Sequence, residues 1–205
     1  LAYMAQDVVQ SYGWLTAGEM LDETFENIGR SFDAANGGFG GSPKFPRPVV
    51  LTFLMRYHAR TGNQRALDMT VTTLRAMANG GIRDQLAGGF HRYSTDERWL
   101  APHFEKMLYD NAQLAITYLE AFQITKDSEY STVAAEILNY VAREMTTPEG
   151  GIWSATDADS EGEEGKFFVW SKREIMEILG SQDGNAFCEF YGVTDTGNFE
   201  GKNIL

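Results

Sequence analysis

Apolar side chains recur every three to four residues in several long segments, which is the spacing of one face of an α-helix. Thr16 suits an N-cap for the first segment, because Glu19 stands three residues later and completes a capping box. Pro48 can open the second helix, which stops near Gly62. The six predicted helices carry the apolar stripes Leu21 to Phe32, Val50 to Tyr57, Leu67 to Ala78, Leu108 to Phe122 and Val133 to Met145, and a short segment from Lys172 to Leu179.

The fourth of these helices is expected to begin at about Pro102 and to end at Thr125. Between helix pairs, a glycine pair followed by an apolar residue recurs. The three copies begin 51 and then 62 residues apart, at Gly37, Gly88 and Gly150. One helical hairpin with a long loop fits that spacing. The pattern therefore predicts a single all-α domain over residues 1–205, with about three hairpins; a short strand is predicted at 167–170.

Composition narrows the function classes. The formal charge of −12 argues against a nucleic-acid partner, which would require a basic surface. No apolar run approaches the roughly 20 residues that span a bilayer, so no membrane protein is expected. Residues 1–7 lack the features of a signal peptide and position 1 is not Met, so we expect the chain to begin inside a longer protein. Cys188 is the only cysteine, which excludes an internal disulfide and favours a reducing, cytoplasmic location.

Four sequence blocks stand out. They are Gly37-Gly38-Phe39-Gly40-Gly41-Ser42-Pro43-Lys44-Phe45-Pro46, Gly88 to Asp96 with Trp99 and His103 to Ala112, Asp157 to Gly162 with Gly165 to Trp170, and Gly197 to Leu205. These blocks resemble the helical domain of a thioredoxin-domain-containing protein family that includes spermatogenesis-associated proteins of animals. The resemblance implies a partial (α/α)6 toroid of the six-hairpin glycosidase type, distantly similar to N-acylglucosamine 2-epimerases. About three hairpins would be present, and the family's thioredoxin-like domain would be absent from this chain.

The resemblance also implies two functions, which the sequence leaves open. One is a carbohydrate-active domain of the isomerase, epimerase or glycosidase type, with a carbohydrate as ligand. The other is a non-catalytic helical scaffold that serves a thioredoxin-like partner domain. Three hairpins out of six would leave inner-helix surface uncovered, so we expect self-association through those helices.

The segment from His103 to Asn111 offers the candidate catalytic groups. If Pro102 opens a helix, His103, Lys106 and Asp110 share one face, beside Glu105. A histidine beside carboxylates suits proton transfer, as in sugar epimerisation. The alternative is a hydrogen-bonded polar cluster that fixes loop geometry. The predicted catalytic residues are His103, Glu105 and Asp110, and the predicted substrate-binding residues are His91, Arg92, Tyr93, Lys106, Trp99, Asp157 and Asp159.

The acidic loop from Asp157 to Gly162 matches an EF-hand loop at positions 1, 3, 5 and 6. Position 12 is Phe168, where calcium binding requires a bidentate Glu, so no metal is predicted; a solvated acidic turn is the alternative. No phosphate-binding G-x-x-x-x-G-K-[ST] motif is present, and no cofactor is predicted. Lys44 is expected either to neutralise a carboxylate or to lie on the surface.

Overall fold

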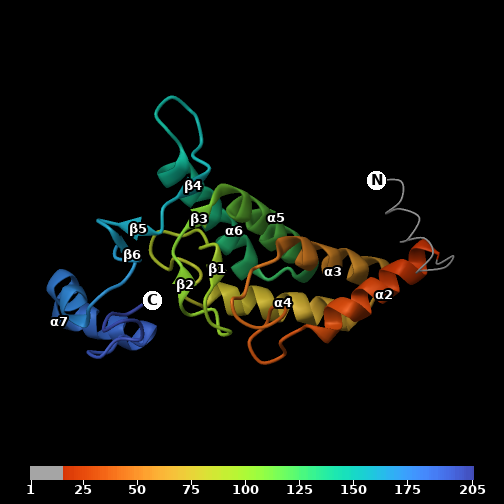
Figure 1. The fold of residues 1–205 in the computed structure, drawn as a ribbon, viewed down its shortest axis with the longest axis horizontal. Helices are drawn as coiled ribbons and strands as arrows, with labels where there is room; N and C mark the ends of the chain where they lie inside the picture. The colour runs from red at the N-terminus through yellow and green to blue at the C-terminus, as the bar shows by residue number, and fades with distance from the viewer. Residues whose placement is uncertain (1–15) are drawn as a thin grey trace.

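The computed structural model describes residues 16–205, and the N-terminal segment 1–15 lies outside the described residues (Figure 1). All six predicted helices are present. The helices are α2 (Ala17–Arg30), α3 (Pro48–Thr61), α4 (Gln64–Ala78), α5 (Leu108–Thr125), α6 (Ser128–Tyr140), the π-helix η1 (Val141–Met145) and α7 (Lys172–Tyr191). Three two-stranded antiparallel ladders complete the fold, formed by β1 (Tyr93–Ser94) with β2 (Pro102–His103), β3 (Lys106–Met107) with β4 (Ala155–Thr156), and β5 (Asp159–Ser160) with β6 (Glu163–Glu164).

Local signals set most helix ends. Thr16 caps α2 in the predicted capping box, with its side chain accepting from the Glu19 N–H and the Glu19 carboxylate accepting from the Thr16 N–H. Pro48 opens α3, and Gly62 ends it in the left-handed conformation. The last helix is longer than predicted, because α7 continues to Tyr191 across a kink at Gly180, where φ is 75°. A glycine can adopt that conformation without strain, so the chain bends there and then resumes the helix.

The predicted start of the fourth helix at Pro102 is wrong. Residues 102–107 are extended, and α5 begins only at Leu108. In β2, His103 pairs with Tyr93, and in β3, Lys106 pairs with Thr156. Partners distant in the chain therefore satisfy this backbone in place of a helix. The expectation that His103, Lys106 and Asp110 share a helical face is wrong for the same reason.

The predicted strand at 167–170 is also absent. Residues 165–168 form a turn, in which the Phe168 N–H donates to the Gly165 carbonyl. Trp170 makes only an isolated antiparallel bridge, with Asn203. The apolar run indicated burial, and Phe168 does pack against a small cluster with Phe104 and Ile204. Burial by itself does not distinguish a strand from a turn.

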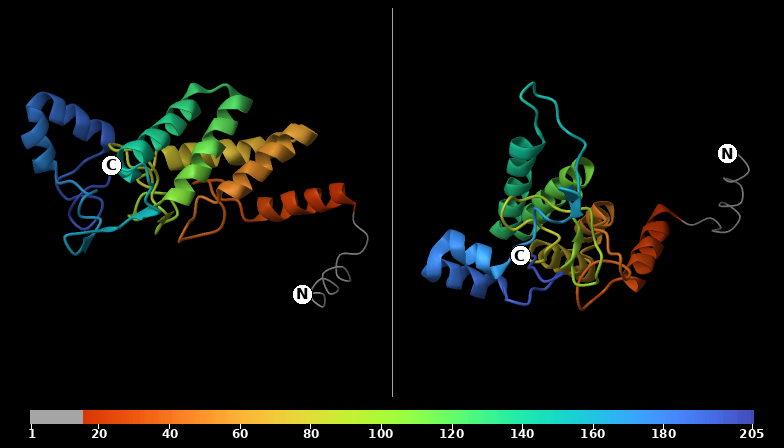
Figure 2. Two further views of the ribbon diagram at one scale, coloured as in Figure 1. Left: turned by 90° about the horizontal axis from the view of Figure 1, so that it is seen from above. Right: turned by 60° about the vertical axis from the view of Figure 1, so that its left-hand side comes forward.

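Helices α3 to α6 form two layers. The loops lie at one end of these helices, between them and α7 (Figures 1 and 2). Helix α3 packs against both α4 and α5, and α5 packs most extensively against α6. The main core is formed between them and includes Leu54, Leu74 and Tyr118. The outward face of α5 remains apolar and exposed along Tyr109, Ile116 and Leu119. This arrangement confirms the predicted all-α fold, a partial (α/α)6 toroid.

The first two glycine loops share one hydrogen-bond scheme, with an aspartate at the start of each. The Asp33 N–H donates to the Gly38 carbonyl (2.9 Å), and the Asp84 N–H donates to the Gly89 carbonyl (3.1 Å). Each aspartate Oδ1 also accepts the N–H groups of the residues two and three positions later. The third loop keeps the backbone part of this scheme, with the Thr147 N–H donating to Gly151. The repeat seen in the sequence is therefore a structural repeat.

A buried lysine closes each of the first two loops. Lys44 Nζ donates to Asp33 Oδ2 (2.6 Å), and Lys106 Nζ donates to Asp84 Oδ2 (2.8 Å). Each ammonium group also donates to a glycine carbonyl of its own loop, at 3.0 Å and 2.9 Å. The Lys44 side chain is 0% exposed and that of Lys106 is 1% exposed. Of the two expectations for Lys44, the neutralised carboxylate is confirmed and the surface position is wrong.

An aromatic ring from the following loop covers each lysine. The ring centroid of Trp99 lies 5.5 Å from Lys44 Nζ, and the ring centroid of Phe168 lies 5.1 Å from Lys106 Nζ. Gly38, at φ +84°, admits the Trp99 ring, because a Cβ atom there would lie 2.5 Å from it. Successive loops are thus locked together by a cation that belongs to one and an aromatic side chain that belongs to the next.

None of the helices in the part of the chain that the structure describes combines the length and the apolarity needed to cross a bilayer.

Candidate functional site

The His103 cluster, which we define as Arg92, Tyr93, His103, Glu105, Asp110 and Glu164, lies where the β1–β2 ladder meets the start of α5. His103 is opposite Tyr93 in the ladder, and the two rings stack with centroids 5.1 Å apart. Phe45 extends the stack, with its ring 4.8 Å from that of Tyr93. The His103 side chain is 30% exposed, so a ligand can reach its imidazole.

Two carboxylates face the His103 ring. Nδ1 is 2.6 Å from Glu164 Oε1, and Nε2 is 4.0 Å from Glu105 Oε2. Glu105 is also held by Arg92, whose Nη1 donates to Glu105 Oε2 at 2.9 Å. A carboxylate that accepts from a ring nitrogen fixes the orientation and the tautomer of an imidazole. This geometry suits a histidine that exchanges a proton with a ligand.

Asp110 lies in the first turn of α5, beside the charges of Arg92 and Glu105. Burial raises the pKa of its carboxyl to about 6; the Glu105 charge adds to the increase and the Arg92 charge opposes it. The Asp110 Oδ2 atom is buried, and within residues 16–205 it has no hydrogen-bond partner. A carboxyl group with a pKa of about 6 can act as a proton donor or acceptor near neutral pH.

The acidic loop contributes a residue that the sequence analysis missed. Glu164 in β6, not Asp157 or Asp159, reaches His103. Asp157 is exposed, and its Oδ1 accepts the Asp159 N–H (3.1 Å) within the loop, as in the predicted solvated turn. Asp159 pairs with Glu164 across the β5–β6 ladder. No sequence signal marks Glu164, because only the fold of that hairpin points it at a histidine 61 residues away.

Two of the residues predicted to bind substrate, Trp99 and Lys106, are buried. Trp99 is 0% exposed, with its Nε1–H donating to the Asn36 carbonyl (3.0 Å). Lys106 is the buried partner of Asp84 described above. Both side chains hold neighbouring glycine loops together, and their role in substrate binding stays a prediction.

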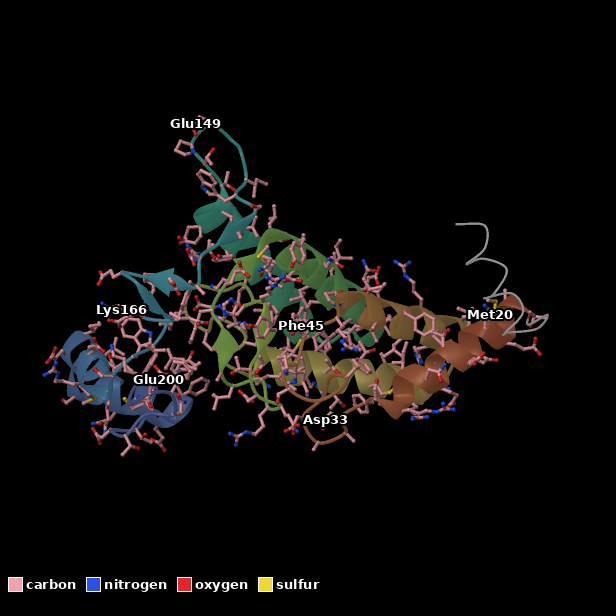
Figure 3. All side chains as sticks on the ribbon, in the orientation of Figure 1. Met20, Asp33, Phe45, Glu149, Lys166 and Glu200 are labelled. Carbon is pink, nitrogen blue, oxygen red and sulfur yellow. The ribbon has the colours of Figure 1, made fainter. Side chains whose placement is uncertain are left out.

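A cavity of about 630 Å³ is lined by His91 and Phe104, among other residues. None of the residues of the cluster lines it. Phe45, of the stack, and Lys166, of the cavity wall, are labelled in Figure 3 and lie on different parts of the molecule. Of the residues predicted to bind substrate, His91 is therefore the one that lines this cavity.

Among residues 16–205, no three His, Cys, Asp or Glu side chains are placed to share a metal ion. His58, the third histidine, bonds within its own hairpin, with Nδ1 3.0 Å from the Asn63 carbonyl.

Sequence comparison identifies long relatives of which this chain matches one part. Spermatogenesis-associated protein 20 of Homo sapiens is 42% identical over 219 residues, which cover 93% of this chain and 28% of the relative. The protein of the same name from Mus musculus is 43% identical, with the same coverage. The chain therefore spans just over a quarter of the length of these relatives. No protein-family model matches it.

Comparison with solved structures identifies the fold. A sugar epimerase from a ruminal bacterium superposes with a TM-score of 0.59 at 15% identity, over 83% of this chain and 53% of the epimerase. Cellobiose 2-epimerase from Bacillus thermoamylovorans superposes with a TM-score of 0.59 at 13% identity, over 86% of this chain and 50% of the epimerase. A family 76 glycoside hydrolase, a mannosidase, from Bacteroides thetaiotaomicron superposes with a TM-score of 0.57 at 15% identity, over 82% of this chain and 50% of the hydrolase. The chain is therefore a homologue of part of spermatogenesis-associated protein 20, with the helical-hairpin fold of the six-hairpin glycosidase-like proteins.

Proposed function

We propose that the chain is part of a carbohydrate-active domain, and that the His103 cluster is its sugar-binding and proton-transfer site. The observation that carries this proposal is the partly exposed His103 imidazole, held by Glu164 at 2.6 Å and stacked on Tyr93. The folds of the sugar epimerases and of the mannosidase support a carbohydrate as the ligand class.

The cluster has the parts that sugar isomerisation or epimerisation requires. Such a reaction removes a proton from a carbon next to a carbonyl group and returns one, so it needs a base and an acid near neutral pH. His103 is the base, oriented by Glu164 and Glu105. Asp110, with its pKa raised to about 6 by burial, supplies the second proton-exchanging group. The exposed Phe45 ring offers an apolar face to the C–H groups of a sugar ring.

A scaffold for a thioredoxin-like partner domain is the second candidate. It is favoured by the ion pairs within the cluster, because His103 with Glu164 joins β2 to β6, and Arg92 with Glu105 joins the residue before β1 to the residue before β3. On this alternative, the cluster holds loop geometry and performs no chemistry.

The two functions are distinguished by His103→Ala, with His58→Ala as the matched control on α3. Binding is measured by thermal shift with a panel of monosaccharides and disaccharides, and the free energy of unfolding by urea titration. For a sugar site, His103→Ala abolishes the ligand-induced shift and changes the unfolding free energy by less than about 1–2 kcal/mol. His58→Ala retains the shift. A large loss of stability in His103→Ala, with no sugar response in the unsubstituted protein, would establish the scaffold.

A further inference from the structure

The charged groups of the His103 cluster are unevenly paired. Arg92 Nη1 lies 2.9 Å from Glu105 Oε2, so this cation is already engaged. His103 Nδ1 lies 2.6 Å from Glu164 Oε1, so the second basic group is engaged as well. Asp110, the third acidic residue of the cluster, belongs to none of the ion pairs within residues 16–205. The cluster therefore has one carboxyl group more than its basic groups can neutralise.

The Asp110 carboxyl group also lacks a hydrogen-bond donor. Its Oδ2 atom is buried and has no partner within residues 16–205, although the residue as a whole is partly exposed. A buried carboxyl oxygen without a donor costs free energy. A cation beside the exposed side of the group would stabilise both oxygens, because a carboxylate shares its negative charge between them.

This pattern of charge separates three kinds of sugar. A sugar acid or a sugar phosphate would place its charge beside three carboxyl groups, while both basic groups of the cluster are engaged. A neutral sugar can donate a hydroxyl hydrogen to Asp110 but brings no charge. An ammonium group brings three N–H donors together with the positive charge that Asp110 lacks.

We propose that the His103 cluster binds a sugar that carries a free amine, with its ammonium group paired with the Asp110 carboxylate. The inference rests on the proposed function of the cluster and adds the charge class of its ligand. Asp110 thereby gains a binding contact, and the role of His103 as the base is unchanged. An N-acetylated amine has no charge, so the N-acetyl sugars are grouped with the neutral ligands.

The test is isothermal titration calorimetry of the whole chain with glucose, mannose and galactose, each compared with its 2-amino and its 2-acetamido derivative. The configuration of the ring is constant within each series, so a difference in affinity reports the amine. In the series that binds, the 2-amino sugar is expected to bind about threefold more tightly than the other two, as the gain of one partly exposed ion pair would give. Glucuronate and glucose 6-phosphate are expected to bind more weakly than glucose.

Two variants locate the contact. Asp110→Asn keeps the shape of the side chain and removes its charge, so the 2-amino sugar and its neutral analogues should then bind alike. Glu149→Gln is the matched control, because Glu149 is exposed at the tip of the third glycine loop and lies outside the cluster (Figure 3). Both variants remove one negative charge from a chain of formal charge −12, but only Asp110→Asn should abolish the preference.

The preference should also depend on pH. Burial and the Glu105 charge raise the pKa of Asp110 to about 6 against the opposing Arg92 charge. The ionised fraction of Asp110 therefore rises from about a tenth at pH 5 to about nine tenths at pH 7, while an aliphatic amine stays largely charged. The advantage of the 2-amino sugar is expected at pH 7 and not at pH 5.

The outcomes distinguish this inference from the function on which it rests. If none of the sugars binds, the proposed function itself fails. If sugars bind but the amine gives no advantage, or if the acidic sugars bind best, the function stands and the amine contact is overturned. A preference that persists in Asp110→Asn, at either pH, would overturn the contact as well.

Discussion

The buried pair of Lys106 and Asp84 gives the sharpest test of how the loops are held. Lys106 Nζ lies 2.8 Å from Asp84 Oδ2, 2.9 Å from the Gly88 carbonyl and 4.2 Å from the Tyr140 ring centroid. Burial lowers the pKa of the Lys106 ammonium, and the Asp84 charge and hydrogen bond counter it. The perturbation is Lys106→Met, which keeps most of the side-chain volume and removes the charge.

The expected loss is large because it leaves a carboxylate buried without its counter-ion. The Asp84 side chain is 10% exposed, and removing one partner of such a pair costs about 3–5 kcal/mol of unfolding free energy. Arg56→Met is the control, because it breaks the pair of Arg56 with Glu120 on the surface, where the Arg56 side chain is 73% exposed. An exposed pair of this kind contributes about 0–1 kcal/mol.

Urea denaturation followed by circular dichroism measures both variants. The double variant Asp84→Leu/Lys106→Met closes the cycle, and it should recover part of the loss because no buried charge is left unpaired. If Lys106→Met lowers the free energy of unfolding no more than Arg56→Met does, the reasoning is refuted. That result would return Lys106 to the ligand-binding role expected from the sequence.

The same pair predicts how stability depends on pH. Burial would raise the pKa of Asp84. The charge and hydrogen bond of Lys106, together with the hydrogen bonds that the Ala87 and Leu86 N–H groups donate to Asp84, lower that pKa overall. A carboxyl group whose pKa is lowered in the folded state stabilises the fold above its ordinary pKa of 3.8, and this stability is lost as the pH falls through the folded-state pKa. In Asp84→Leu/Lys106→Met, the acid-dependent loss of unfolding free energy should therefore be smaller.

Two further predictions concern Asp110 and the exposed face of α5. The folded-state pKa of Asp110, about 6, is above its ordinary 3.8, so its stabilising contribution is full below pH 4 and is lost as the pH rises through 6. Asp110→Asn should raise the melting temperature at pH 8 and leave it unchanged at pH 4; an equal change at both pH values would exclude a raised pKa. Self-association through α5 should decrease in Ile116→Lys/Leu119→Lys, measured by sedimentation velocity, because both side chains lie in its exposed apolar face. An unsubstituted chain that is monomeric at all concentrations would exclude it.

Sequence periodicity predicted the helices well because the signals are local. The capping box at Thr16, the proline at the start of α3 and the glycine at its end act within one turn of the helix. The glycine repeats were also visible, since positive φ at Gly38 and Gly89 must be encoded at those positions themselves. Residue identity and spacing were sufficient for these features.

The candidate site needed the tertiary structure. Residues 102–107 have the spacing of a helix, but pairing with β1 and β4, from loops on either side, makes them extended. That pairing places His103 on the surface beside Glu164 and buries Lys106 against Asp84. The sequence specified which side chains are available. The long-range pairing of the loops decided which of them face solvent, because successive residues of a strand point to opposite sides.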